Sequence, residues 1–293
     1  MLKNSLVFIS IIIGVLFPFG HSYTYLIQYF LMVMLFWAFL EIDFSGNPFN
    51  RKQFYLVAAN IITPLFWYYI IMPFNSTLAL VAFVAALAPT AIASATLVSI
   101  LNKNIKFTTV YVMISNFAMS IGASFLLPLV VSKSIQISVI DVLLPSLQVV
   151  GYPLILALII DKYLPSFANY MIQRKGNAYF LLIINLYLAS SKASHFIVTE
   201  YTGPIYFIFF IGIAISIIAF INFAIGKKIG GSDLRLECGQ GLGQKNNSFT
   251  IWIALTFLSP LAALGPIFYL FFQNTYISYL LHKHRHDIGV RIK

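Results

Sequence analysis

The amino-acid sequence predicts an all-α membrane protein with ten transmembrane helices. The first observation is its composition, because 60% of the 293 residues are hydrophobic and only 9% are charged. Soluble domains contain about a quarter charged residues, so this chain needs lipid to cover its apolar surface. The other two observations are a regular series of long apolar stretches and an uneven distribution of lysine and arginine between them.

Ten stretches are long enough to cross a bilayer, for which a helix needs about 20 mostly apolar residues. The first follows Lys3 as in a signal peptide, but no small-residue cleavage pattern comes after it, so we interpret it as a retained helix. Polar segments such as 43–48, 173–176 and 226–228 separate later stretches. The ten stretches lie near residues 4–20, 23–42, 53–73, 77–101, 106–131, 138–161, 178–199, 204–225, 233–257 and 259–281.

Lysine and arginine gather on one side of this arrangement. If the chain starts in the cytoplasm, the outside loops contain a single basic residue, Lys133. Cytoplasmic loops normally hold the excess of basic residues, so both termini are predicted to be cytoplasmic in a multi-pass protein of a cell inner membrane. The basic residues of the inside segments are Lys3, Arg51, Lys52, Lys103, Lys106, Lys162, Arg174, Lys175, Lys227, Lys228, Arg235, Lys283, Arg285, Arg291 and Lys293.

An arrangement of ten spans divides into two halves of opposite orientation, because the sixth span starts outside. Residues 1–131 are predicted to form a first five-helix repeat and residues 132–281 an inverted second repeat. Residues 282–293 form a basic cytoplasmic tail. Inverted repeats of this kind are typical of secondary transporters.

The fourth and ninth spans, which correspond in the two halves, are predicted to be discontinuous. The fourth contains Pro89 and small polar residues up to Thr96, and the ninth has alternate glycines at 239, 241 and 243 beside Gln, Lys and Asn. Backbone groups freed in hydrocarbon cost several kcal/mol each unless protein or water pairs them. Both breaks should therefore lie in an enclosed or hydrated centre, and such paired breaks indicate a transporter's binding site.

These segments resemble the bile acid:sodium symporter family. Residues 89–96 with Lys103 and Asn104 match, without gaps, its P-G-G-T-A-S-N-V…G-N pattern on the first crossing helix. Residues 243–246, then Pro260 and residues 272–274, are similar to its E-x-G-x-Q-N, P and W-H-N elements. The resemblance implies alternating-access transport of a small or amphipathic organic anion. It also implies a core of spans 3–5 and 8–10, and a panel of spans 1, 2, 6 and 7.

The resemblance places the substrate between core and panel. Half-helix N-termini carry partial positive charge, which suits a carboxylate or sulfate. The substrate-binding groups that it implies are the backbone N–H groups around Ala91, Ile92 and Ala93 and the side chains of Asn246, Gln273 and Asn274.

The family's sodium ligands are only partly present. Ser94 and Thr108 keep hydroxyl groups, but Ala95 and Val112 stand where the family has Asn and Thr. One alternative is therefore a sodium-coupled symporter with a single surviving site at Ser94, Thr108 and Glu237, and sodium is the one metal that the resemblance implies.

Lys245 stands where the family has a sodium-binding glutamine. The family's acidic position falls on Gly241 in a gapless alignment, or on Glu237 if four residues are inserted. A charge near mid-membrane costs about 2.5–3.5 kcal/mol or more, so such residues are functional by default. We predict that its ammonium group replaces a sodium ion, satisfied by Gln244, Asn247, unwound carbonyls and Glu237. Burial disfavours a charged lysine, so sodium-independent or proton-coupled transport is expected.

Two function classes compete with a transporter, namely a membrane-embedded enzyme and a ligand sensor. The sequence has no H-E-x-x-H, G-x-G-D or G-x-S-G motif, which is evidence against an enzyme. The formal charge of +10 is spread over short loops, which favours anionic lipid headgroups over nucleic acid as partners. Cys238 is the single cysteine, so no internal disulfide forms, and no cofactor other than sodium is expected.

Overall fold

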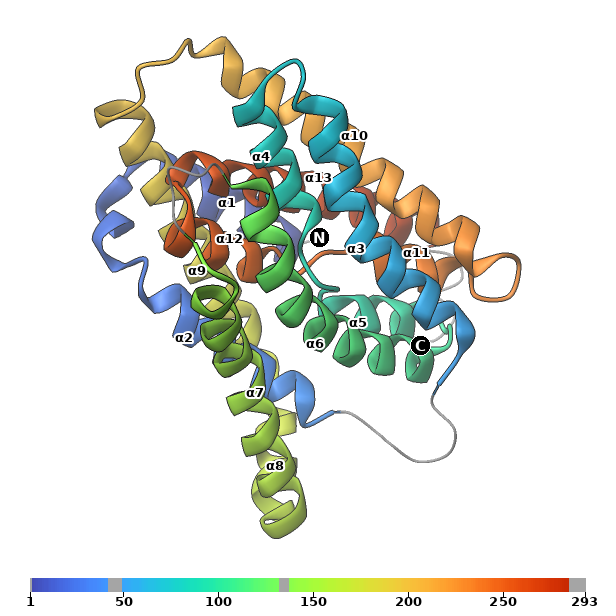
Figure 1. Ribbon diagram of the computed structural model, residues 1–293. Helices are drawn as coiled ribbons and strands as arrows, with labels where there is room; N and C mark the ends of the chain where they lie inside the picture. The colour runs from blue at the N-terminus through green and yellow to red at the C-terminus, as the bar shows by residue number, and fades with distance from the viewer. Residues whose placement is uncertain (1, 42–48, 132–136, 285–293) are drawn as a thin grey trace.

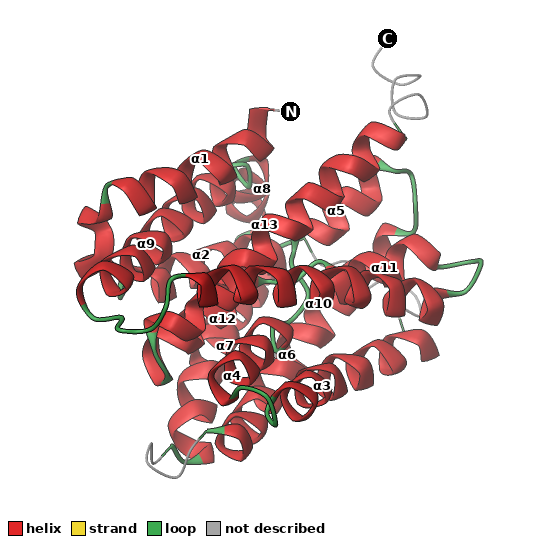
Figure 2. Ribbon diagram, turned by 90° about the horizontal axis from the view of Figure 1, so that it is seen from above, coloured by secondary structure: helices red, strands yellow, loops and turns green. Residues whose placement is uncertain are grey.

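The computed structural model describes residues 2–41, 49–131 and 137–284. This part of the chain is helical throughout and has no strand beyond one isolated bridge, as Figure 2 shows. The predicted all-α membrane class is confirmed, because five helices are long and apolar enough to cross a bilayer. These five are α3 (Arg51–Ile71), α6 (Ile105–Val130), α7 (Val139–Tyr163), α9 (Asn177–Thr199) and α10 (Tyr206–Gly230).

The remaining helices are shorter or more polar, and several cross behind the long ones in Figure 1. A 3-10 helix, η1 (Pro18–Tyr23), follows the first helix. The other α-helices are α1 (Leu2–Leu16), α2 (Leu26–Phe39), α4 (Ser76–Ala86), α5 (Ala93–Ile100), α8 (Pro165–Gln173), α11 (Arg235–Gly243), α12 (Asn247–Phe257) and α13 (Pro260–Lys283).

Polar side chains begin several of these helices. Asn50 and Ser138 form capping boxes at α3 and α7, while Asn75, Asn104 and Ser259 accept backbone N–H groups at α4, α6 and α13. A cap satisfies one of the N–H groups that a helix leaves unpaired at its start. The apolar segments thus start at defined polar residues.

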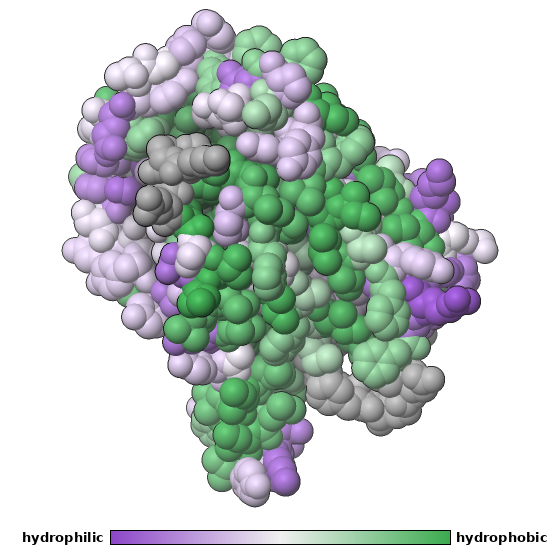
Figure 3. Space-filling model, viewed as in Figure 1, coloured by the Kyte–Doolittle hydropathy of each residue, from purple (hydrophilic) through white to green (hydrophobic). Residues whose placement is uncertain are grey.

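Large hydrophobic side chains cover much of the outer surface. Phe66, Leu129 and Phe209 are exposed on three different helices. Figure 3 shows a broad hydrophobic face over α3, α6 and α7, with hydrophilic residues gathered at its edges, including the turn between α10 and α11. A soluble protein rarely exposes so much contiguous apolar surface, so this face belongs in lipid.

Small residues allow two pairs of helices to approach closely. A Cβ at Gly14 of α1 would lie 2.7 Å from Ser190 Cβ on α9. A Cβ at Gly226 of α10 would lie 2.3 Å from the backbone oxygen of Cys238 on α11. Close backbone contact of this type provides the van der Waals packing that holds helices together in a membrane.

The two segments predicted to be discontinuous each consist of two helices. Residues 87–92 separate α4 from α5, and residues 244–246 separate α11 from α12. Other boundaries differ from the prediction. The first helix ends at Leu16, because Pro18 starts η1, and the predicted loop after α7 contains α8. Asp43, Lys133 and residues 285–293 of the predicted tail lie outside the described residues.

Candidate functional site

The non-helical residues of the two broken segments pair with each other. Thr90 and Lys245 form the isolated antiparallel bridge. The N–H of Ala91 donates to the Gln244 carbonyl at 2.8 Å, and the N–H of Asn246 donates to the carbonyl of the residue before Thr90 at 2.7 Å. These reciprocal bonds have the pattern of a two-fold axis through the bridge. We call residues 87–92 and 244–246 together the crossover.

Helix α6 satisfies the backbone of Thr90. The Thr90 N–H donates to Ser115 Oγ at 2.9 Å, and Asn116 Nδ2 donates to the Thr90 carbonyl at 3.2 Å. The Thr90 hydroxyl donates to the Gly241 carbonyl at 2.6 Å and lies 3.1 Å from the Ser115 hydroxyl. The side chains of Thr90, Ser115 and Asn116 are fully buried, so these bonds replace the water that the break would otherwise need.

Helix α13 does the same for Lys245. Its N–H donates to Gln273 Oε1 at 2.9 Å, and Gln273 Nε2 donates back to its carbonyl at 3.3 Å. Asn247 Nδ2 also donates to the Lys245 carbonyl, at 3.1 Å. One glutamine therefore serves both backbone groups of Lys245. Gln273 therefore supports the break. The sequence suggested that it binds a substrate, but both ends of its amide bond to the Lys245 backbone.

Lys245 is enclosed by protein, with 1% of its surface exposed. It donates to Asn60 Oδ1 on α3, not to the side chains of Gln244 or Asn247. Within the described residues no ion pair involves Lys245. A buried cation with a neutral partner is costly unless something with negative charge joins it.

Asn60 connects the cation to the first break. Its Nδ2 donates to Ser115 Oγ at 3.1 Å, and Ser115 contacts Thr90, whose hydroxyl reaches Gly241 on α11. A continuous hydrogen-bond network therefore runs from the second break through α3 and α6 to the first break and back to α11. Networks of this kind fix relative positions strongly because every member is buried.

Several buried polar atoms around the crossover lack a hydrogen-bond partner among the described residues. Native interiors leave few such atoms unpaired, so their concentration here distinguishes the crossover from ordinary packed core. They include both donors and acceptors. The atoms are Ser94 Oγ, Asn116 Oδ1, Gln240 Nε2 and Oε1, Gln244 Oε1, Asn246 Nδ2 and Asn247 Oδ1.

The three residues proposed for a surviving sodium site do not point their oxygen atoms at a common position, because two of them bond to the backbone of Asn104. Glu237 Oε1 accepts the Asn104 N–H at 2.9 Å, and the Thr108 hydroxyl donates to the Asn104 carbonyl at 3.2 Å. Both groups thus support the start of α6. Only Ser94 keeps an unpartnered hydroxyl, and no hydrogen bond joins it to Thr108 or Glu237 in the described chain. The arrangement does not fit a sodium site.

A side chain at Gly241 would be packed tightly against two neighbours. A Cβ there would lie 3.0 Å from the Tyr111 ring and 3.3 Å from Leu56 Cδ1. Glu237 is the buried carboxylate of this segment, with 3% of its surface exposed. Its partner is the backbone of Asn104, so it does not satisfy Lys245 as the sequence suggested.

The predicted substrate residues occupy unlike positions. The N–H of Ala91 is used within the crossover, while Ala93 is exposed on the first turn of α5. Ile92 and Asn246 are half-buried at the edge of the crossover. Asn274 Nδ2 donates to its own helix at 2.8 Å. Asn246 Nδ2 is the predicted side-chain donor that stays unpaired and buried.

Sequence reasoning did not single out Asn60, Ser115 or Asn116. Each lies inside a long apolar helix, where a polar side chain needs a partner. The signal was therefore present as isolated amides and hydroxyls within apolar spans. Spacing could not reveal that they converge on Thr90 and Lys245, because the helices that carry them meet only in three dimensions.

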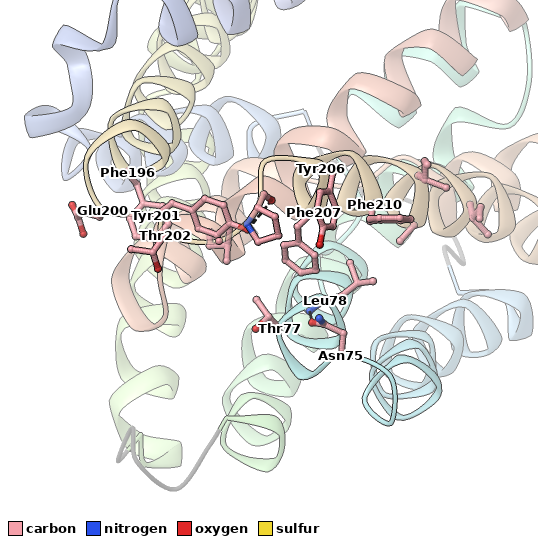
Figure 4. A pocket seen from close by; sticks show the side chains of 16 residues that line it. Asn75, Thr77, Leu78, Phe196, Glu200, Tyr201, Thr202, Tyr206, Phe207 and Phe210 are labelled. Carbon is pink, nitrogen blue, oxygen red and sulfur yellow. Dashed lines mark hydrogen bonds between the residues drawn. The ribbon is translucent and has the colours of Figure 1, made fainter.

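A separate cavity of about 870 Å³ lies away from the crossover. It is formed by the start of α4, the end of α9 and the first half of α10. Figure 4 shows Tyr206 and Phe207 of α10 on the side of Asn75 and Leu78, with Glu200 at the end of α9. None of its lining residues belongs to the crossover. Its lining is mainly apolar, as expected of a groove that faces lipid.

Comparison of the chain with models of known protein families gives no match, and comparison with curated proteins gives none.

Proposed function

We propose that this protein is a secondary active transporter that carries an organic anion by alternating access without sodium. In this proposal ten spans form two inverted five-helix repeats, with the broken fourth span (α4 and α5) and ninth span (α11 and α12) crossing at the centre. Spans 3–5 and 8–10 form the core, and spans 1, 2, 6 and 7 form the panel. The observation that carries the proposal is the reciprocal pairing of the two breaks around a buried lysine.

The inverted repeat is supported by equivalent contacts in the two halves. In the first half Asn60 on α3 bonds to a hydroxyl on α6, and that hydroxyl supports Thr90. In the second half Asn222 on α10 bonds to the hydroxyl of Tyr269 on α13 at 3.2 Å, and Tyr269 bonds to the carbonyl of Gly243 at 2.9 Å. In both halves an asparagine of the span before the break bonds to a hydroxyl of the span after it, and this likeness supports a correspondence of spans 3–5 with spans 8–10.

The proposed orientation places both termini in the cytoplasm of a cell that has this protein in its inner membrane. The inner half-helices are then α5 with 8 residues and α11 with 9, while the outer halves, α4 and α12, have 11 each. The crossover therefore lies nearer the cytoplasmic side, by about 2 Å from the middle at 1.5 Å per residue. Cysteines at positions 202 and 103 in a Cys238→Ser background should label from outside and inside respectively.

An anion is the charge that the crossover favours. Lys245 provides a buried positive charge without a carboxylate partner among the described residues, and Asn246 Nδ2 is an unpaired buried donor. The helices α5 and α12 both begin at the crossover, so their partial positive ends lie there as well. A carboxylate or sulfate that reaches the half-buried edge at Ile92 and Asn246 compensates these charges, whereas an organic cation is repelled.

Lys245 is also the proposed coupling group. Its ammonium group holds a place between α3 and the second break through Asn60. Release of its proton removes the charge that attracts the anion and leaves a neutral amine that still reaches Asn60. Proton release on one side of the membrane and uptake on the other then links the anion cycle to a pH gradient.

Uptake into proteoliposomes tests the proposal. A ligand-stabilisation screen of labelled organic carboxylates and sulfates first identifies a transported anion. Its uptake should persist when choline replaces sodium, and it should respond to a pH gradient. Lys245→Gln should abolish the pH response, while Lys192→Gln, which alters a half-buried lysine on the panel helix α9, should retain it.

The rival functions predict other results. A sodium-coupled symporter loses uptake in choline, and a ligand sensor binds the anion without accumulating it inside the vesicles. A membrane-embedded enzyme chemically changes the labelled compound, which chromatography of the vesicle contents detects. Tighter binding of organic cations than of anions contradicts the role given to Lys245.

A further inference from the structure

A second cavity, of about 440 Å³, opens at the end of the molecule where α10 meets α11. Three of its lining residues are basic, namely Lys227, Lys228 and Arg235, and none is acidic. Phe220 and Tyr276 form its apolar part on α10 and α13. The cavity therefore combines a cluster of positive charge with an aromatic wall, outside the crossover and its network.

The positive charge of this cavity is not neutralised by neighbouring carboxylates. Lys227 donates to the Tyr276 hydroxyl, and its Nζ lies 4.9 Å from the centre of that ring. Asp233 is close in sequence, but its carboxylate binds Lys52 at 2.7 Å. In the described residues Lys228 and Arg235 have no ion pair and are exposed. Arg235 also begins α11, whose partial positive end adds to the same charge.

The apolar wall continues onto the outer surface of α10. Phe220 is 45% exposed, and its ring lies 6.1 Å from Tyr276 at 80°, in an edge-to-face contact. Phe223 also packs against Tyr276, with ring centres 4.3 Å apart. An exposed apolar side chain such as Phe220, within the span of a membrane helix, contacts acyl chains. A ligand here therefore meets positive charge at one end and hydrocarbon at the other.

We propose that this cavity is a binding site for an anionic glycerophospholipid, whose phosphate contacts Lys227, Lys228 and Arg235 and whose acyl chain lies along Phe220. Basic pockets between transmembrane helices accept such headgroups. The site is separate from the substrate anion, because α11 carries Arg235 at its start and reaches the crossover only after Gly243. A lipid bound at Arg235 holds α10, α11 and α13 together.

The test uses purified full-length protein in detergent and native mass spectrometry of bound lipid. The probes are phosphatidylglycerol, phosphatidylcholine with the same acyl chains, and inorganic phosphate. Wild-type protein should retain phosphatidylglycerol at least tenfold more tightly than phosphatidylcholine. The Lys228→Gln, Arg235→Gln double variant should weaken phosphatidylglycerol binding by about fivefold for each charge removed. Both changed residues are exposed, so the fold should persist, and thermal unfolding checks this.

The matched control is the Arg51→Gln, Lys103→Gln double variant, which removes the same two kinds of charge from exposed positions outside the cavity. It should bind phosphatidylglycerol as the wild type does. Equal weakening in both variants means diffuse attraction to net charge and overturns the proposal. So does binding of inorganic phosphate in competition with the lipid, which would indicate a soluble anion, and so does equal retention of the two lipids.

Discussion

The two halves of the crossover satisfy their backbones in the same way but differ in the side chain at the centre. Thr90 has its N–H and carbonyl served by α6, and Lys245 has its N–H and carbonyl served by Gln273 on α13. The short Thr90 side chain ends at the carbonyl of Gly241. The long Lys245 side chain crosses to Asn60. Asn222 on α10 bonds to the hydroxyl of Tyr269, as Asn60 bonds to that of Ser115, but its Oδ1 atom has no partner among the described residues.

This difference separates what the fold requires from what function adds. Any helix broken within a bilayer must have its freed backbone groups paired, and both halves meet this need with polar side chains of the next span. Nothing in that requirement calls for a charge. Lys245 adds a buried cation at an energetic cost, and the pairing of the backbone does not account for it.

The largest expected loss of stability comes from changing Ser115, which supports the backbone of Thr90 in the first half of the crossover. Ser115→Ala removes the acceptor of two buried donors, the Thr90 N–H and Asn60 Nδ2. Each orphaned donor costs about 1–3 kcal/mol, so the free energy of unfolding should fall by about 2–6 kcal/mol, measured by thermal and denaturant unfolding in detergent. Ser120→Ala on the same helix is the control, because this buried hydroxyl bonds only to the carbonyl four residues back, at 2.7 Å. Equal losses would contradict the special role of Ser115.

Replacing Lys245 or Thr90 by an apolar residue should change the free energy of unfolding in opposite directions. Lys245→Met should raise the free energy of unfolding, because the cost of burying an unpaired charge exceeds the about 1–3 kcal/mol cost of leaving Asn60 Oδ1 without its donor. It should also abolish anion binding. Thr90→Val should lower stability by about 1–3 kcal/mol, because the Gly241 carbonyl loses its donor. Denaturant unfolding with and without the anion measures both, and a destabilised Lys245→Met variant that still binds anions would refute the comparison.

Mutations can distinguish Gln273, which supports the backbone of Lys245, from Asn274, its neighbour on α13. Gln273→Leu leaves the buried Lys245 N–H without its acceptor and should cost about 1–3 kcal/mol. Asn274→Leu removes a bond of the half-buried Asn274 to its own helix and should cost less than about 1 kcal/mol. Thermal unfolding of both variants ranks them. The reverse order would assign the support of Lys245 to another residue.

The smallest effect concerns the turn between α10 and α11, where Lys52 on α3 binds both carboxylate oxygens of Asp233, at 2.7 and 2.8 Å. This hydrogen-bonded ammonium holds the pKa of Asp233 below its usual value. A lowered carboxyl pKa stabilises the fold above the ordinary value of about 3.9, and this stability is lost as the pH falls through the lowered pKa. Asp233→Asn should remove a small acid-dependent part of stability between pH 5 and pH 2.

The control for this last effect is Asp161→Asn, which changes an exposed carboxylate that has no ion pair within the described chain. Its unfolding midpoint should follow that of the wild type across the same pH range. High salt should reduce the contribution of Asp233, because the pair is exposed and screened.

The sequence alone determined the all-helical membrane class and the location of both breaks. Those properties depend on local composition, since long apolar stretches need lipid, and small, polar and helix-breaking residues are concentrated in two of the stretches, around Pro89 and around Lys245. Lys245 could also be identified as unusual from its place in an apolar segment. The amphipathic α8 was missed, because its nine residues are too short and too mixed to give a membrane-span pattern.

Only the tertiary structure decided what these residues contact. Asn60, Ser115 and Gln273 lie on three different helices and meet at the two breaks. The N–H of Ala91, which the sequence suggested as an anion-binding group, pairs with the Gln244 carbonyl instead. The tertiary structure also places Glu237 away from Lys245, at the start of α6. Hydrogen bonds act over about 3 Å, so their partners depend on how distant segments pack, which a residue pattern along one helix does not encode.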